Sequence, residues 1–286
     1  MPGAHTTTTP YEGPLSGKRL DARRVYSALV FLPLFYLLVR YGPPLGFFIL
    51  VLAVTLLALT EFYRLHFRES SASPAIALGL GCAGLLLISM QWPGLAPQGL
   101  VLVITLAVAL VSRLFSGEAL KQSLVDAAVL LLGVLYVGLL LGHVLLTRAH
   151  PDGEWLIFFL ILVTWAGDAG AYYVGSAMGQ RKLAPVISPN KTVEGLLGGL
   201  GLSVIAALAG KVWFVPAFRL VDCVALGLLL AVAGVMGDLA ESALKRSAGV
   251  KDSGRVIPGH GGMLDRLDSM LFTAPAFYYY VTLVKG

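Results

Sequence analysis

Long apolar runs separated by short polar segments constrain the fold of this chain more than any other feature. Hydrophobic residues make up 57% of the sequence and charged residues only 13%, whereas about 25% of residues are charged in an ordinary soluble domain. The runs approach the roughly 20 residues that a helix needs to cross a bilayer. They are continuous rather than alternating, which excludes a membrane β-barrel. The sequence therefore predicts an all-α polytopic membrane protein, because a helix satisfies its own backbone in lipid.

We predict about nine membrane-spanning helices. A cytoplasmic N-terminus places 16 of the 21 Lys and Arg residues on the cytoplasmic side, in agreement with the positive-inside rule. We therefore expect the C-terminus outside and a polar cavity that opens to the cytoplasm. The predicted spans cover residues 25–39, 44–63, 74–90, 100–114, 124–147, 155–179, 193–215, 221–246 and 266–284.

Three regions differ in composition. Residues 1–24 form a polar tail at the cytoplasm or the membrane surface, without the layout of a cleaved signal peptide. Residues 25–150 supply scaffold helices, and dimer contacts could lie there. Glu61 is at a span end, where charges are tolerated, so we assign this region no chemistry. Residues 151–286 carry the candidate catalytic groups. Basic edges beside anionic lipid account for the net charge of +5, so no nucleic-acid partner is needed.

A carboxylate lies deep in the sixth span. Asp168 is 11 residues before Gly179, hence roughly 16 Å from the cytoplasmic edge at about 1.5 Å per residue. A charge at that depth is costly and is by default a functional candidate. The alternative is a polar contact between helices.

The following cytoplasmic segment, 179–195, contains Ser188, Asn190 and Lys191 just before a helix start. Free N–H groups at a helix start, together with a lysine, suit a phosphate. An ordinary basic cytoplasmic loop accounts for the same residues equally well.

The eighth span ends in a polar stripe. Asp238, Glu241, Ser242 and Lys245 fall at i, i+3, i+4 and i+7, which places them on one helix face. A salt bridge between Glu241 and Lys245 explains those two residues but not Asp238, one turn deeper. A glycine-rich loop, Ser247–Leu264, follows, and its backbone N–H groups can approach an anion closely.

Two more acidic residues, Asp265 and Asp268, begin the last span. Compensation of the helix dipole could explain either one alone, but not their occurrence together with Asp168 and Asp238 toward one membrane face. Magnesium takes one or two carboxylates plus substrate phosphates, and cations hold the remaining charge. The pattern therefore favours nucleotide or phosphoryl transfer at a membrane surface. A transporter would place its charges at the midplane, between inverted repeats.

These residues resemble the phosphatidate cytidylyltransferase family. The main motif is Ser242-x-x-Lys245-Arg246, then Lys251-Asp252, then His260-Gly261-Gly262-x-x-Asp265-Arg266-x-Asp268. Two further blocks that look like the family are Asp168-x-x-Ala171-Tyr172-x-x-Gly175 and Ser188-Pro-Asn-Lys191-Thr-Val-Glu194-Gly195. The resemblance covers residues 155–285. Ser176 stands where the family usually has a basic residue, and Val193 where it often has an aromatic one.

The resemblance implies that CTP and phosphatidic acid react to give CDP-diacylglycerol and pyrophosphate, with magnesium as one ion or two. It also implies a homodimer in a bacterial cytoplasmic membrane, with the site facing the cytoplasm. The implied metal ligands are Asp238, Asp265, Asp268 and Asp168. The implied substrate-binding residues are Ser188, Asn190, Lys191, Ser242, Lys245, Arg246 and Arg266. Asp238 and Asp265 are also expected to be catalytic, together with Lys251, Asp252 and His260.

Three alternatives stay open at this point. A related cytidylyl- or phosphotransferase could act on another lipid phosphate, such as a polyprenyl one, because apolar spans do not distinguish acyl from isoprenyl chains. An ion-coupled transporter could use Asp168 and Asp238. The chain could also be a non-catalytic membrane scaffold, although its intact acidic and basic positions argue against that.

Overall fold

The computed structural model describes residues 22–67, 69–114, 119–254 and 261–285. The chain divides into two units, Met1–Gly42 and Pro43–Gly286. In the first unit the described element is one helix, α1 (Ala22–Tyr41), where Tyr41 packs against Tyr36 and lies under the Arg40 guanidinium. The predicted tail lies almost wholly outside the described residues.

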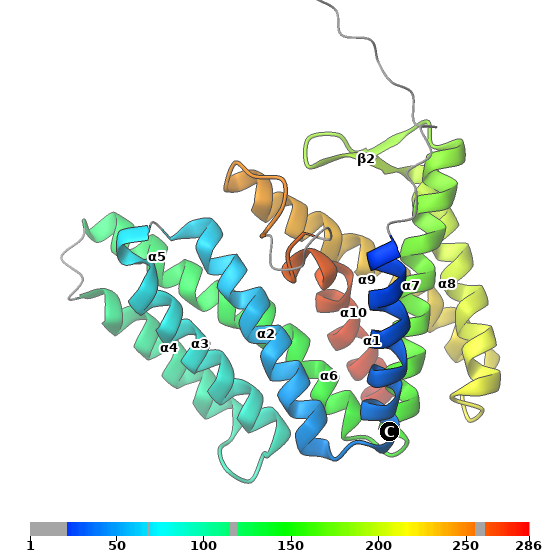
Figure 1. Ribbon diagram of the computed structural model, residues 1–286, viewed down its shortest axis with the longest axis horizontal. Helices are drawn as coiled ribbons and strands as arrows, with labels where there is room; N and C mark the ends of the chain where they lie inside the picture. The colour runs from blue at the N-terminus through cyan, green and yellow to red at the C-terminus, as the bar shows by residue number, and fades with distance from the viewer. Residues whose placement is uncertain (1–21, 68, 115–118, 255–260, 286) are drawn as a thin grey trace, which may run out of the picture. The chain divides into compact units, whose positions relative to one another are not determined.

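The second unit is built mainly from helices (Figure 1). α5 and α6 are joined through a π-helical segment, Val134–Leu139, and a second one, Val281–Lys285, extends α10. A short 3-10 turn, Leu264–Arg266, comes just before α10. The helices are α2 (Pro44–His66), α3 (Glu69–Gln91), α4 (Gln98–Leu114), α5 (Leu120–Gly133), α6 (Leu140–Arg148), α7 (Gly153–Met178), α8 (Val193–Trp213), α9 (Leu220–Ser247) and α10 (Asp268–Tyr280).

Each predicted span coincides with helix among the described residues. Six stretches are long and apolar enough to cross a membrane: Pro44–His66, Pro74–Gln91, Lys121–Arg148, Gly153–Met178, Val193–Trp213 and Leu220–Ser247. Two helical stretches, Leu32–Tyr41 and Gln98–Arg113, are apolar but shorter. The all-α membrane class is therefore confirmed, while nine spans and the cytoplasmic N-terminus stay predictions.

The segment between α7 and α8 was expected to be a loop and instead forms a small antiparallel hairpin. Its strands are β1 (Lys182–Ala184) and β2 (Ser188–Thr192). Glu194, in the first turn of α8, accepts hydrogen bonds from the backbone N–H groups of Gln180 and Arg181 at 3.0 and 3.1 Å. The start of the hairpin is therefore tied to the start of α8.

Close packing through small residues brings α7 and α8 together. A Cβ atom added at Gly170 would lie 2.6 Å from the carbonyl oxygen of Gly198. One added at Gly198 would lie 2.5 Å from the Cβ of Val174. Small residues allow membrane helices to approach at this distance. The contact fixes the position of the hairpin over α7.

α10 lies between α6 on one side and α7 and α9 on the other, and it contacts all three helices (Figure 1). The apolar core beside it includes Phe159 of α7, Leu226 of α9 and Phe277 of α10, all fully buried. The rings of Phe159 and Phe277 are stacked, with their centroids 5.8 Å apart. This core holds the polar start of α10 against α7 and α9.

Candidate active site

Three helices bring carboxylates together near the start of α10. Asp168 comes from the middle of α7, Asp238 from α9 and Asp268 from the first residue of α10. The Asp268 carboxylate interacts electrostatically with both others. Ser269 donates its hydroxyl to Asp168 at 3.0 Å, and Ser242 donates its hydroxyl to Asp238 at 3.3 Å. We call Asp168, Asp238 and Asp268 the acidic triplet.

The hairpin supplies a cation to the acidic triplet. Lys191, on β2, forms an ion pair with Asp238 and interacts electrostatically with Asp168 and Asp268. The next residue, Thr192, accepts a hydrogen bond from a backbone N–H of the first turn of α8 at 3.0 Å and so caps the helix. Capping fixes where β2 ends, so the hairpin holds Lys191 in place over α9.

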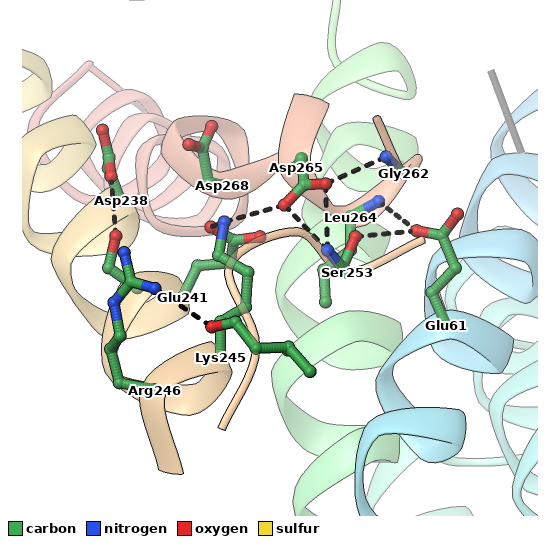
Figure 2. Close-up of polar contacts among 12 residues, drawn as sticks. Glu61, Asp238, Glu241, Lys245, Arg246, Ser253, Gly262, Leu264, Asp265 and Asp268 are labelled. Atoms are coloured by element: carbon green, nitrogen blue, oxygen red, sulfur yellow. Dashed lines mark hydrogen bonds and ion pairs between the residues drawn. The ribbon is translucent and has the colours of Figure 1, made fainter. Parts of the chain in front are cut away.

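A second charged group lies one turn further along α9 (Figure 2). Lys245 forms ion pairs with Glu241 at 2.6 Å and with Asp265 at 2.7 Å. Asp265 also accepts hydrogen bonds from the backbone N–H groups of Ser253 at 3.1 Å and Gly262 at 2.9 Å. Burial works to raise the pKa of Asp265, but its hydrogen bonds, foremost from Lys245, lower the pKa to about 2. Asp265 is therefore anionic at neutral pH.

Asp265 and Asp268 do not share one helix face as expected. Asp265 lies in the 3-10 turn Leu264–Arg266, and α10 begins only at Asp268. The two carboxylates consequently join different groups: Asp265 binds Lys245 and the loop, while Asp268 joins the acidic triplet. Among the described residues, no set of three or more His, Cys, Asp or Glu side chains is arranged to hold a metal ion.

The other predicted site residues that the structure describes come from the hairpin, α9, the loop after α9 and the 3-10 turn. Ser188 and Asn190 lie on β2 near Lys191, and Arg246 of α9 donates to the carbonyl of Val250 at 3.1 Å. Lys251, Asp252 and Arg266 are exposed, and His260 lies outside the described residues.

Glu61 was not predicted to belong to the site, yet it contacts both described ends of the glycine-rich loop. This α2 carboxylate is only 3% exposed. It accepts hydrogen bonds from the Ser253 hydroxyl at 3.1 Å and from the backbone N–H groups of Met263 at 2.9 Å and Leu264 at 2.8 Å. The sequence signal was a carboxylate in an apolar helix, which we interpreted as an interfacial charge.

Tyr136 is a second contribution from the first half of the chain. It lies in the π-helical segment between α5 and α6, and its hydroxyl is buried without a hydrogen-bond partner among the described residues. It interacts electrostatically with Asp238, Glu241 and Asp268. The first half of the chain is therefore part of the site's surroundings as well as a scaffold.

Comparison with known proteins agrees with the resemblance drawn from the motifs. The model of the cytidylyltransferase family matches residues 22–284. A phosphatidate cytidylyltransferase of Staphylococcus aureus (strain COL) is 38% identical over 256 residues, which cover 88% of this chain and 94% of the relative. One of Bacillus subtilis (strain 168) is 35% identical over 269 residues, or 91% of this chain and 95% of the relative.

These matches define the class of protein: a membrane-embedded nucleotidyltransferase that uses a cytidine nucleotide. The chain belongs to the cytidylyltransferase family. The family resemblance inferred from the sequence is confirmed.

Proposed function

We propose that this chain is a phosphatidate cytidylyltransferase, which converts CTP and phosphatidic acid into CDP-diacylglycerol and pyrophosphate. The observation that carries the proposal is the near full-length match to relatives of that name. The convergence of Lys191 with the acidic triplet supports it, because this arrangement suits the joining of two phosphate-bearing substrates.

The reaction needs little acid–base chemistry from the protein. The second pKa of a phosphate monoester is near 6, so the lipid phosphate is largely a dianion at neutral pH. One of its oxygens bonds to the α-phosphorus of CTP while the bond from that phosphorus to the bridging oxygen breaks, and pyrophosphate leaves with that oxygen. The main obstacle is repulsion between two polyanions. Positioning and charge neutralisation overcome it.

The positively charged residues of the site would reduce this repulsion between the two substrates. Lys191 and Lys245 are partly buried and pair with carboxylates, and each would place a positive charge beside a bound substrate phosphate. Arg246, Lys251 and Arg266 add positive charge at the exposed edge. Ser188, Asn190 and Ser242 supply neutral donors for CTP or the phosphatidate head group, and Asp252 and His260 would assist the departure of pyrophosphate.

The carboxylates of the acidic triplet have the right chemistry for a divalent metal, but among the described residues they do not form a complete metal site, so substrate phosphates would have to supply further ligands. The groups are carboxylates, which hard cations prefer, and magnesium usually takes only one or two of them besides substrate phosphates. The proposed ligands are Asp238, Asp268 and Asp168, of which one or two would bind the ion directly, and Asp265 of the neighbouring group is a further candidate. When bound, the metal would neutralise charge on the reacting phosphates. Oxygen donors from three helices favour magnesium over softer metals.

The membrane location and the oligomeric state are proposed from the family resemblance. The enzyme is integral to a bacterial cytoplasmic membrane, and its active site faces the cytoplasm, where CTP is found. It works as a homodimer, and part of the contact comes from the N-terminal helices.

Labelled CTP, magnesium and phosphatidic acid, supplied to the purified protein in detergent–lipid micelles, test the proposal. We expect a labelled lipid and one pyrophosphate per turnover, loss of product with a chelator, and recovery on addition of magnesium. Asp238→Asn is the matched inactive control. Polyprenyl phosphate forms a parallel arm, and turnover of that lipid alone would reassign the substrate. The absence of product with either lipid would refute the enzymatic function.

A further inference from the structure

Glu61 of α2 connects the first half of the chain to the active site. We infer that Glu61 is a positioning residue, which holds both ends of the glycine-rich loop so that Asp265 and Lys245 keep their places. The inference rests on the proposed function for its kinetic consequence, but not for its structural one. We assign Glu61 no catalytic role, because its carboxylate is buried and both of its oxygens accept hydrogen bonds from the loop.

The hydrogen bonds of Glu61 use both carboxylate oxygens. Oε2 accepts from the Ser253 hydroxyl at 3.1 Å and from the Leu264 N–H at 2.8 Å, while Oε1 accepts from the Met263 N–H at 2.9 Å. Ser253 lies before residues 255–260, whereas Met263 and Leu264 lie after them. One carboxylate therefore joins two segments of the loop, and Figure 2 shows it facing them from α2.

The loop backbone approaches this carboxylate as closely as glycine allows. A Cβ added at Gly254 would lie 2.7 Å from Glu61 Oε1, and one added at Gly262 would lie 2.5 Å from Oε2. Real Cβ atoms essentially never come that close to another heavy atom. Glycine at both positions therefore lets the backbone close around Glu61.

Asp265 also binds the two loop segments on either side of residues 255–260. It accepts from the Ser253 N–H at 3.1 Å and from the Gly262 N–H at 2.9 Å, and it pairs with Lys245. Ser253 therefore lies between the two carboxylates, with its hydroxyl bonded to Glu61 and its N–H bonded to Asp265. If Glu61 releases the loop, the donors of Asp265 move with it, and Lys245 loses a fixed partner.

A purely structural role is the competing explanation, because buried polar groups are generally hydrogen-bonded and their loss destabilises the fold. Asp222 provides a matched control. It is a fully buried carboxylate at the opposite end of α9, and it accepts from the Arg219 N–H at 2.7 Å and the Tyr280 hydroxyl at 3.2 Å. Loss of either carboxylate removes buried hydrogen bonds, but only Glu61 contacts the loop.

The first measurement is hydrogen–deuterium exchange of wild type, Glu61→Gln and Asp222→Asn in detergent. A glutamine keeps the shape, but its amide NH₂ cannot accept, so at least one loop donor loses its partner. We expect faster exchange in peptides covering 261–267 for Glu61→Gln and unchanged exchange there for Asp222→Asn. This readout needs no substrate, so it stands even if the proposed reaction fails. Equal exchange in all three proteins would overturn the inference.

The second measurement is turnover per folded protein, at a temperature well below unfolding. We expect Glu61→Gln to lower kcat by roughly 10- to 100-fold, the scale at which a displacement of about 1 Å acts on a reacting group. Its KM for CTP should change by less than about threefold, and Asp222→Asn should keep kcat. A kcat within twofold of wild type for Glu61→Gln, or the same loss in both variants, would contradict the inference.

Ser253→Ala gives a milder test, which can also be made if Glu61→Gln does not fold. It removes only the hydroxyl bonded to Glu61 and leaves the N–H that binds Asp265. We expect the same two effects at smaller size. Because residues in contact are non-additive, the double variant should lose less than the product of the two single losses. Strictly multiplicative losses would show that Glu61 does not act through Ser253.

Discussion

Lys245→Met tests whether the charged group beside the acidic triplet is held together by one lysine. Lys245 is 13% exposed and pairs with Glu241, which is 1% exposed, and with Asp265. Methionine keeps the length of the side chain but leaves two carboxylates facing each other without a cation. Removing one partner of a buried ion pair costs about 3–5 kcal/mol.

This loss of stability corresponds to a decrease in the melting temperature, Tm. For domains of 150–250 residues, a loss of 1 kcal/mol lowers Tm by about 2–4 °C, so the variant should melt roughly 6–20 °C below wild type. Circular dichroism in detergent would record the transition. We also expect turnover of CTP to fall at temperatures where the variant is still folded, because Asp265 loses its closest partner.

A second substitution separates charge from packing. Glu241→Gln, added to Lys245→Met, replaces one of the two carboxyl groups with an amide that can donate to Asp265, so the double variant should melt above Lys245→Met. If the double variant melts lower, or Lys245→Met melts within about 2 °C of wild type, the charged group does not work as described. Glu241→Gln alone is the packing control, because Lys245 then still has Asp265.

Lys191→Met should lower kcat/KM for CTP by about 10²- to 10³-fold, the usual cost of removing one positioned donor. Its Tm should change little, because the ion pair of Lys191 is partly exposed. Steady-state kinetics and a thermal melt measure the two effects. Gly262→Ala should lower both Tm and kcat, because its Cβ would press on the Ser253 hydroxyl, and unchanged kcat would argue against a closely packed loop. Gly198→Ala should destabilise the protein, because the added Cβ would clash with α7. Gly201→Ala, with open space around it, should be neutral or stabilising by up to about 1 kcal/mol. Similar Tm values for these two variants would refute the close α7–α8 contact.

Periodicity and apolar length predicted much of this molecule. Helix positions follow from the apolar runs, and the α9 stripe follows from spacing alone, since residues seven apart share a helix face. The Glu241–Lys245 pair is the i,i+4 contact that the spacing suggested. The contact from Lys245 to Asp265 spans 20 residues. No periodicity predicts that contact, because it depends on how the loop folds back.

Glu61 and the hairpin were missed for two different reasons. The partners of Glu61 are about two hundred residues away in sequence, and a carboxylate near a helix end is usually a solvated charge. The strands 182–184 and 188–192 are short and polar, without the alternating pattern that marks a half-buried strand. In both cases tertiary contacts, not local preference, determine the structure.

The structure at the start of α10 explains why Asp265 and Asp268, only three residues apart, belong to two different charged groups. Had Asp265 and Asp268 followed one regular helix, both carboxylates would face the same side, three residues apart. Instead the 3-10 turn Leu264–Arg266 precedes α10, and Asp265 is held by backbone N–H groups of the loop. That capture requires the loop ends to be closed, which Glu61 achieves from α2. The first half of the chain thereby helps to decide which carboxylate joins the acidic triplet and which one anchors Lys245.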